Sequence, residues 1–378
     1  MMNIRDFFNK NKMLTLVMAT LLIWVLFHIL TGQNYLTARN ISNLFRQMAI
    51  TGVLATGMMF VIINGEIDLS VGSSLGLLGG IGAMMNVWFG MPVWVVLISV
   101  FALGILIGAF NGYWVAYAKI PSFIVTLAGM LAFRGILLGF TKGQTISPID
   151  PGFSYLGNGY INHTLSLIIA VVVAVLFIIS TFSKRNGRIK YGLPVSDMKM
   201  DIIKCVCVSA VMLGMVLIFN LRQGMPFPVF ILLVLLIGLT FMADRTVFGR
   251  RIYAIGSNRE ATRMSGVDVD KIKMFVFMLM GATAAIAGLL TTARLGAGDA
   301  AAGNMGELDA IASCFIGGAS MRGGVGTVAG ALIGALIMAS LDNGMSMMGL
   351  DSFWQMIVKG SVLLLAVFID VATSNKAA

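Results

Sequence analysis

Two similar strings, GEID and GELD, place acidic side chains at the start of glycine-rich apolar runs. A carboxylate at bilayer depth is costly unless it faces water, pairs with a cation or hydrogen-bonds to free backbone groups. Glu66 and Asp68 of the first string, and Glu307 and Asp309 of the second, are therefore candidate residues of a path across a membrane. The alternative is that they lie at the membrane interface, where charged side chains snorkel or cap helices.

Other side chains could complete such a path. Arg134 and Lys359 lie in apolar segments and are candidate partners for the acids. A neutral solute needs hydrogen-bonding groups more than it needs charge. The uncharged candidates are Ser70, Ser73, Asn111, Thr126, Asn343 and Ser346.

A basic, polar island at residues 244–273 separates two apolar spans. Within it Ser257 and Glu260 have the spacing of a capping box, and Gly266 is placed to end the helix. So short a helix is not stable alone in water, which indicates that it docks into a partner. The alternative is a surface helix that only connects two spans. The predicted docking helix comprises Ser257, Asn258, Arg259, Glu260, Ala261, Thr262, Arg263, Met264, Ser265 and Gly266.

Composition settles the class of protein. Hydrophobic residues make up 58% of the chain and charged residues only 11%, against roughly 25% charged residues in soluble domains. An all-α, polytopic membrane protein is therefore expected. The net charge of +10 is a topology signal, because basic residues gather in cytoplasmic segments. Basic residues gather before residue 13, at 184–204 and at 245–273, which places these segments and both termini in the cytoplasm.

About twelve membrane-spanning helices, or 10–12, are expected in a single transmembrane domain of residues 1–378. The domain divides into a first helical half (13–182), an inserted span pair with the docking loop (183–272) and a second half (273–378). The predicted spans are 13–30, 45–63, 71–88, 95–118, 123–140, 165–182, 203–220, 229–243, 274–294, 308–319, 325–341 and 353–371, the tenth of them short.

The strings GEID and GELD fall on opposite faces of this topology. Opposed copies of one unit are typical of an inverted repeat, and transporters with this symmetry commonly place their pathway in broken or re-entrant segments. The alternative is a coincidence between two short strings. Glycines that recur every fourth residue, such as Gly104, Gly108 and Gly112, predict close helix packing.

Several chemistries find no support in the sequence. The string G-x-x-x-x-G-K-[ST], which cradles nucleotide phosphates, does not occur. His28 and His163 are isolated, so neither a metal site nor a nucleophile triad can be assembled. Cys205, Cys207 and Cys314 are interpreted as small packing residues. We expect no cofactor on this chain, no nucleic-acid partner and no enzymatic activity of its own.

Five segments carry a resemblance to a known family. They are GEIDLSVGSSLGLLGG (65–80), KIPSFIVTLAGMLAFRGILLG (119–139), FGRRIYAIGSNREATRMSGV (248–267), GELDAIASCFIGGASMRGGVGTVAGALIGA (306–335) and SLDNGMSMM (340–348). In these segments the chain resembles the membrane permease subunit of bacterial ribose- and xylose-type ABC importers, and the D-xylose form is the most similar.

The resemblance implies a permease that moves a monosaccharide, D-xylose in the most similar form, from periplasm to cytoplasm by ATP-driven alternating access. It implies an ATP-binding cassette ATPase, a periplasmic sugar-binding protein and a second permease copy as partners in the bacterial inner membrane. Residues 257–266 would then be the coupling helix to the ATPase. Two rival hypotheses are a permease for another sugar or a branched-chain amino acid, and an ion-coupled transporter that uses the four acids.

Overall fold

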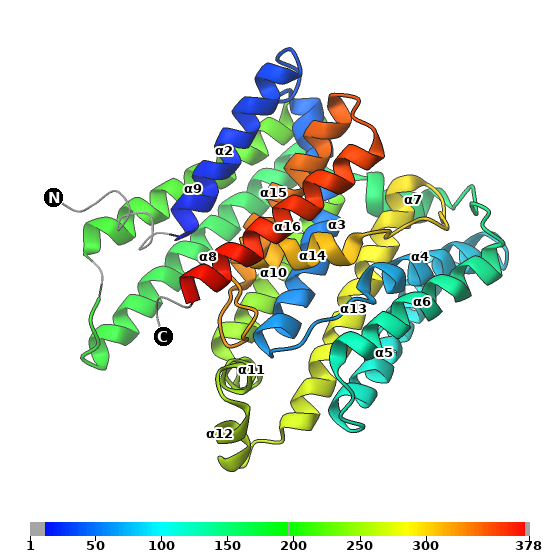
Figure 1. Cartoon of the computed structure of the whole chain (residues 1–378). Coiled ribbons are helices and arrows are strands. Elements are labelled where there is room, and N and C mark those ends of the chain that lie inside the picture. Colours follow the sequence, from blue (N-terminus) through cyan, green and yellow to red (C-terminus); the bar gives the residue numbers. More distant parts are fainter. Residues whose placement is uncertain (1–11, 196, 375–378) are drawn as a thin grey trace.

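The computed structural model describes residues 12–195 and 197–374, which fold almost entirely into helices (Figure 1). Nine of the described helices are long and apolar enough to cross a membrane. They are α2 (Lys12–Leu30), α3 (Ala38–Ile63), α5 (Val93–Ala116), α6 (Ser122–Thr141), α8 (His163–Lys190), α9 (Met198–Asn220), α10 (Phe227–Arg245), α13 (Val269–Leu295) and α15 (Val328–Met347).

Shorter elements complete the fold. The apolar helix α4 (Val71–Val87) and the apolar part of α16 fall below the length of a full span. The remaining elements are α7 (Pro151–Asn158), α11 (Val247–Ser257), α12 (Arg259–Met264), α14 (Gly306–Ile316), α16 (Ser352–Ser374), β1 (Tyr160–Ile161) and β2 (Met225–Pro226), the two strands being antiparallel.

The prediction of a polytopic helical bundle is confirmed, and each of the twelve predicted spans coincides with a helix. Several boundaries were wrong. The helix α3 begins at Ala38 rather than residue 45, because the Thr37 side chain accepts a hydrogen bond from the backbone N–H of Asn40 and caps it. Helix α8 extends to Lys190, past the apolar run. Arg5 and Lys10, of the basic N-terminal segment, lie outside the described residues.

Two antiparallel helices, α3 and α13, lie in contact at the centre of the bundle (Figure 1). The helices that follow each of them pack on the other: α4 and α5 contact α13, while α14 and α15 contact α3. In addition α4 packs on α6, and α14 packs on α16. This exchange of equivalent partners between two halves is the arrangement that an inverted repeat predicts.

The short helices α4 and α14 begin against each other inside the bundle. Gly72 in the first turn of α4 lies against the carbonyl oxygen of Gly303 and the carboxylate of Glu307. Eleven residues make α14 only about 16 Å long, against a hydrocarbon core of about 30 Å. The predicted broken segments are therefore present where α3 passes into α4 and where α13 passes into α14.

The span pair α8 and α9 forms a hairpin at one side of the molecule (Figure 1). The hairpin contacts the rest of the bundle through α9, which packs on α3. The strands β1, just before α8, and β2, which follows α9, pair with each other at the open end of the hairpin. The contacts between the two halves do not involve this hairpin. The division of the chain after residues 182 and 272 stays a prediction.

The glycine stripe on α5 has the packing role that its spacing predicted. A Cβ at Gly104 would lie 2.5 Å from the carbonyl oxygen of Gly281, and one at Gly108 would meet the carbonyl oxygen of Phe277. The backbones of α5 and α13 thus approach closely, as small residues permit in lipid.

We predict that Gly108→Ala destabilises the purified protein by about 1–3 kcal/mol, because the added methyl group collides with backbone atoms of α13. Gly135→Ala on α6 is the matched control, since no atom lies within 4 Å of a Cβ there. The measurement is the thermal unfolding midpoint in detergent. Equal midpoints for the two variants would contradict the close approach of α5 and α13.

Candidate functional site

The link between α3 and α4, residues 64–70, gathers four of the predicted pathway residues. Asp68 accepts hydrogen bonds from the backbone N–H and the hydroxyl of Ser70, at 2.8 and 2.6 Å. Asn111 of α5 donates its amide to the Ser70 hydroxyl oxygen at 2.9 Å. Thr126 of α6 accepts from the backbone N–H of Leu69 at 3.0 Å. All four predicted side chains are buried and form one connected polar group.

This polar group keeps unused hydrogen-bonding capacity. Asp68 makes no ion pair within the described part of the chain. The side-chain oxygen of Asn111 and both polar side-chain atoms of Asn64 are buried without a hydrogen-bond partner among the same residues. Such atoms are costly to bury unpaired, so they favour contact with a polar solute.

Glu66 lies on the same link but has a different role. It forms an ion pair with Lys273 of α13, whose side chain is only 3% exposed. The predicted partners Arg134 and Lys359 were wrong for this acid. Because Lys273 neutralises Glu66, the pair fastens the link between α3 and α4 to the start of α13.

Of the two acids of α14, Asp309 lies apart from the Asp68 group, and Glu307 lies at its edge. Lys359 of α16 contacts Asp309 and also Asp342 of α15, each at 2.9 Å, so the predicted pairing of Lys359 with an acid is confirmed. Glu307 lies against the start of α4, beside Gly72.

Arg134 of α6 donates hydrogen bonds to the carbonyl oxygens of Ala300 and Ala302 at 2.9 Å, rather than to a carboxylate. It therefore holds the non-helical backbone that leads into α14.

The remaining uncharged candidates are scattered. Ser73 is buried in α4, and Ser346 is exposed near the end of α15. Asn343 is buried near the outer end of α15, where it accepts a hydrogen bond from Asn40 of α3 at 2.8 Å. The structure therefore does not join Asn343 or Asp309 to the Asp68 group.

The predicted docking helix exists, but its capping was wrong. Ser257 is the last residue of α11, and Asn258 caps α12 instead, its side-chain oxygen accepting from the backbone N–H of Ala261 at 2.9 Å. Asn258 adopts the extended backbone that a cap requires, whereas Ser257 is still helical. Glu260 takes part in no capping box; it lies in the first turn, where an acid favours the helix dipole.

The predicted end of the helix is confirmed. Gly266 has a left-handed φ of +84° and donates its N–H to the carbonyl oxygen of Arg263 at 3.0 Å. Val267 donates to Thr262 at 3.4 Å, which completes a Schellman motif. The expected helix of residues 257–266 is thus six residues long, Arg259–Met264.

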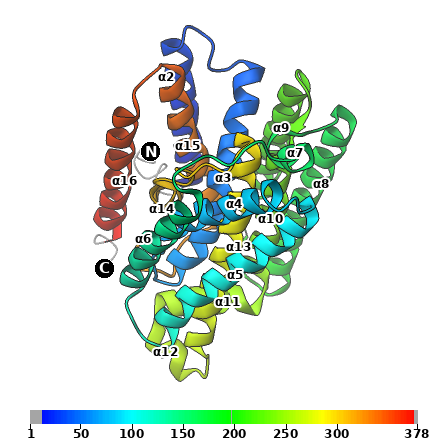
Figure 2. The same cartoon turned by 90° about the vertical axis from the view of Figure 1, so that its right-hand side faces the viewer.

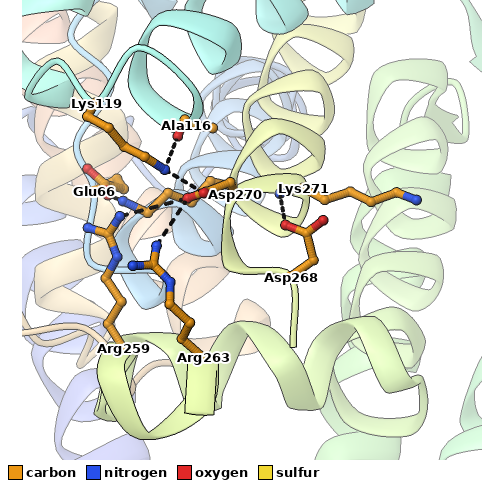
Figure 3. Close-up of polar contacts among 9 residues, drawn as sticks. Glu66, Ala116, Lys119, Arg259, Arg263, Asp268, Asp270 and Lys271 are labelled. Atoms are coloured by element: carbon orange, nitrogen blue, oxygen red, sulfur yellow. Dashed lines mark hydrogen bonds and ion pairs between the residues drawn. The ribbon is translucent and has the colours of Figure 1, made fainter. Parts of the chain in front are cut away.

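One face of α12 is fastened to the bundle (Figure 3). Arg263 and Arg259 point to Asp270 at the start of α13, with nitrogen-to-oxygen distances of 3.5 and 4.0 Å. Lys119, between α5 and α6, reaches the same carboxylate at 2.5 Å. The opposite face is free: the Met264 side chain is 89% exposed.

Two short polar chains connect α12 with the link at residues 64–70. In the first, Lys119 lies three residues before Ser122, the first residue of α6, and Ser122 accepts a hydrogen bond from the backbone N–H of Ile67 at 3.3 Å. In the second, Lys273 lies one helical turn from Asp270 and pairs with Glu66. Contiguous contacts therefore run from α12 to the link that carries Asp68.

Helix α11 contacts both halves of the bundle. Gly256 lies against the carbonyl oxygen of Ile63 and the backbone nitrogen of Gly324, and Gly324 donates to Ile63 at 2.8 Å. Tyr253 donates its hydroxyl to the carbonyl oxygen of Gly326 at 2.9 Å. Burial raises the pKa of Tyr253, which keeps this hydroxyl protonated and able to donate.

The comparison with protein families decides what this bundle is. The family described as "Branched-chain amino acid transport system / permease component" matches residues 40–367, which run from α3 into α16 and include α11 and α12. The chain belongs to this permease family. It is accordingly a multi-span transport subunit rather than an enzyme.

Curated relatives cover nearly the whole permease. It is 51% identical to the xylose transport system permease protein XylH of Escherichia coli (strain K12) over 97% of this chain and 93% of the relative. Identity to XylH of Haemophilus influenzae is also 51%, over 96% of each chain. The ribose import permease protein RbsC of Escherichia coli is 36% identical over 89% of this chain and 87% of its own. No solved structure matched the permease.

Sequence reasoning missed several polar residues of the permease. Lys273, Asp270 and Lys119 were recognised at most as charges of cytoplasmic loops, and Asn40 and Asp342 were not singled out. A signal existed for the first two, since an acid and a base three residues apart at a helix start share one face. Nothing in the sequence pointed to Asn40, whose partner lies some 300 positions away on α15.

We predict that Lys273→Met destabilises the permease by about 3 kcal/mol, because it leaves the carboxylate of Glu66 buried and unpaired. The double variant Glu66→Gln with Lys273→Met should recover most of that loss. Lys271→Met is the control, since Lys271 points away from the cluster (Figure 3). Thermal unfolding of the wild type and the three variants is the measurement, and a double variant no more stable than Lys273→Met would contradict the pairing.

Proposed function

We propose that this permease is the membrane subunit of an ABC importer that moves a monosaccharide, D-xylose in the first instance, from periplasm to cytoplasm. The observation that carries the proposal is similarity to xylose permeases along 97% of the chain. Support also comes from the bundle itself, whose exposed cytoplasmic helix is joined by polar contacts to a buried polar group between two broken helices.

A separate ATPase would supply the work, since the sequence lacks the phosphate-binding string G-x-x-x-x-G-K-[ST]. We infer that this ATPase receives the free face of α12, where Met264 is exposed. Arg259 and Arg263 lie on the fastened face and would transmit the motion through Asp270. A docked helix can bias a bundle between two states only if its contacts differ between them.

Within the bundle, Asp68, Ser70, Asn111 and Thr126 are the proposed solute-contacting group. Sugar hydroxyls donate and accept hydrogen bonds, which suits an amide, two hydroxyls and a carboxylate. Glu66, Glu307, Asp309 and Asn343 are proposed to hold the breaks and helix ends in place, because each lies against a fixed element of the bundle.

The assembly would contain a second permease copy and a periplasmic sugar-binding protein, in the inner membrane with both termini in the cytoplasm. An ion-coupled mechanism is the second candidate. It finds less support, because Glu66 and Asp309 are already paired with lysines.

The deciding experiment is sugar uptake into proteoliposomes that contain the permease and its ATPase, with the binding protein supplied outside. We expect D-xylose uptake that requires ATP and the binding protein and ignores ionophores. Uptake driven by an ion gradient without ATP would overturn the proposal in favour of ion coupling. Stimulation of the ATPase by another sugar, or by a branched-chain amino acid, would replace the substrate and keep the mechanism.

We predict that Met264→Asp lowers co-purification of the ATPase at least about tenfold, because a charge replaces the apolar anchor of a small interface. Met200→Asp, on the 62% exposed methionine at the start of α9, is the matched control. Both variants should insert in the membrane and unfold at the wild-type temperature. Full retention of the ATPase by Met264→Asp would remove α12 from the contact.

A further inference from the structure

A cavity of about 520 Å³ is lined by residues before and within the start of α3. The start of α3 lies at the end of the bundle opposite α12 (Figures 1 and 2). The cavity lies between the start of α3, the turn that joins α9 to α10, and the end of α15. Every charged residue that lines it is an arginine: Arg39 and Arg46 from α3 and Arg222 from the turn. Asn34, Asn40 and Asn43 add amide groups.

None of the three arginines is neutralised within residues 12–195 and 197–374, where they form no ion pair. Arg46 is held in place by neutral groups, since it donates to the side-chain oxygen of Asn158 at 3.2 Å and to the hydroxyl of Tyr160. Its guanidinium also lies 4.9 Å from the centre of the Tyr160 ring. The Nε of Arg46 is buried and has no hydrogen-bond partner in the described part of the chain.

Three such charges around one cavity repel one another and create a positive potential. The amino end of α3 adds to it, because the free N–H groups of a helix start carry partial positive charge. A ligand with carboxylates relieves this repulsion, and the planar fork of arginine binds a carboxylate through two parallel hydrogen bonds. A neutral sugar would leave the charges unbalanced, and no aromatic ring for stacking lines the cavity.

The place of the cavity favours a protein over a lipid headgroup. Its main wall is the start of α3, where Asn40, Ser42 and Leu44 are buried inside the molecule, whereas only 17% of the most apolar windows of the peripheral helices α8 and α9 is buried. The cavity is also joined to the bundle core, because Asn40 on its wall donates to Asn343 of α15. This hydrogen bond links the cavity wall to α15, which is one of the two helices of the second half that pack on α3.

We propose that this arginine cavity is the docking site for acidic side chains on the sugar-binding protein. The proposal rests on the proposed function, which supplies that partner. The cavity seats one or two carboxylates of the partner against Arg39, Arg46 and Arg222, and the contact orients the sugar-loaded protein over the outer end of α3. The neutral Asn40 and Asn343 pair then links the docked partner to the bundle.

The test is the affinity of the sugar-loaded binding protein for the permease–ATPase complex in nanodiscs, measured at low and high salt. We expect Arg39→Glu with Arg222→Glu to weaken binding at least about tenfold and to remove most of its salt dependence. Both residues are exposed, so the variant should fold. The milder Arg39→Gln with Arg222→Gln should give an intermediate loss.

Lys142→Glu is the matched control, because Lys142 is an exposed base on an outer loop and does not line the cavity. It should bind the partner like the wild type. Basal ATPase activity should be unchanged in all variants, which separates a docking defect from a failure of the transporter.

Wild-type affinity in both arginine variants would overturn the proposal. So would an equal loss in Lys142→Glu, which would indicate general surface charge rather than this cavity. Retention of anionic lipid by the wild type but not by the arginine variants, with partner affinity unchanged, would assign the cavity to a lipid. Absence of ATP-driven uptake by the wild type would instead defeat the proposed function.

Discussion

Non-helical backbone inside a lipid-embedded bundle must have its hydrogen bonds satisfied by the protein itself, and this constraint shapes the centre of the permease. Two breaks carry such backbone, one before α4 and one before α14. A single helix, α6, serves both of them. Its Ser122 and Thr126 accept from backbone N–H groups of the first break, and its Arg134 donates to carbonyl oxygens of the second.

The same helix is also connected to α12. Lys119, three residues before the start of α6, shares the carboxylate of Asp270 with the two arginines of α12. Helix α12 and the parts that surround the buried polar group are therefore neighbours in one network. The charges of this network are mostly paired, which leaves Asp68 and its uncharged neighbours as the polar group with spare hydrogen-bonding capacity.

Much of this arrangement could be predicted from the sequence. Each of the twelve predicted spans fell on a helix, and the nine helices long enough to cross a membrane left the clearest signal, because a full span must match the bilayer. The pairing of Lys359 with an acid followed from the high energy of isolated charges in lipid. The short helix α12 was located from its polar surroundings and its terminal glycine, and its docking to a partner stays a prediction.

What could not be predicted depended on three-dimensional contact. Ser257 and Asn258 both suit a helix cap, and only the length of α11 decides between them. The partners of Glu66 and Asn343 lie more than two hundred positions away, on helices whose relative placement no local pattern records. Arg134 was expected to pair with a carboxylate. Its hydrogen bonds go instead to backbone carbonyl oxygens of the second break.

The meeting of α4 with α14 through Gly72 and Gly303 has a mechanical consequence. Where side chains close a passage, a rotamer change in one of them can open it. Here main chain of one segment rests on main chain of the other, with the side chain of Glu307 beside them. Parting the two helix starts therefore requires movement of the backbone, which a change of side-chain rotamers alone does not supply.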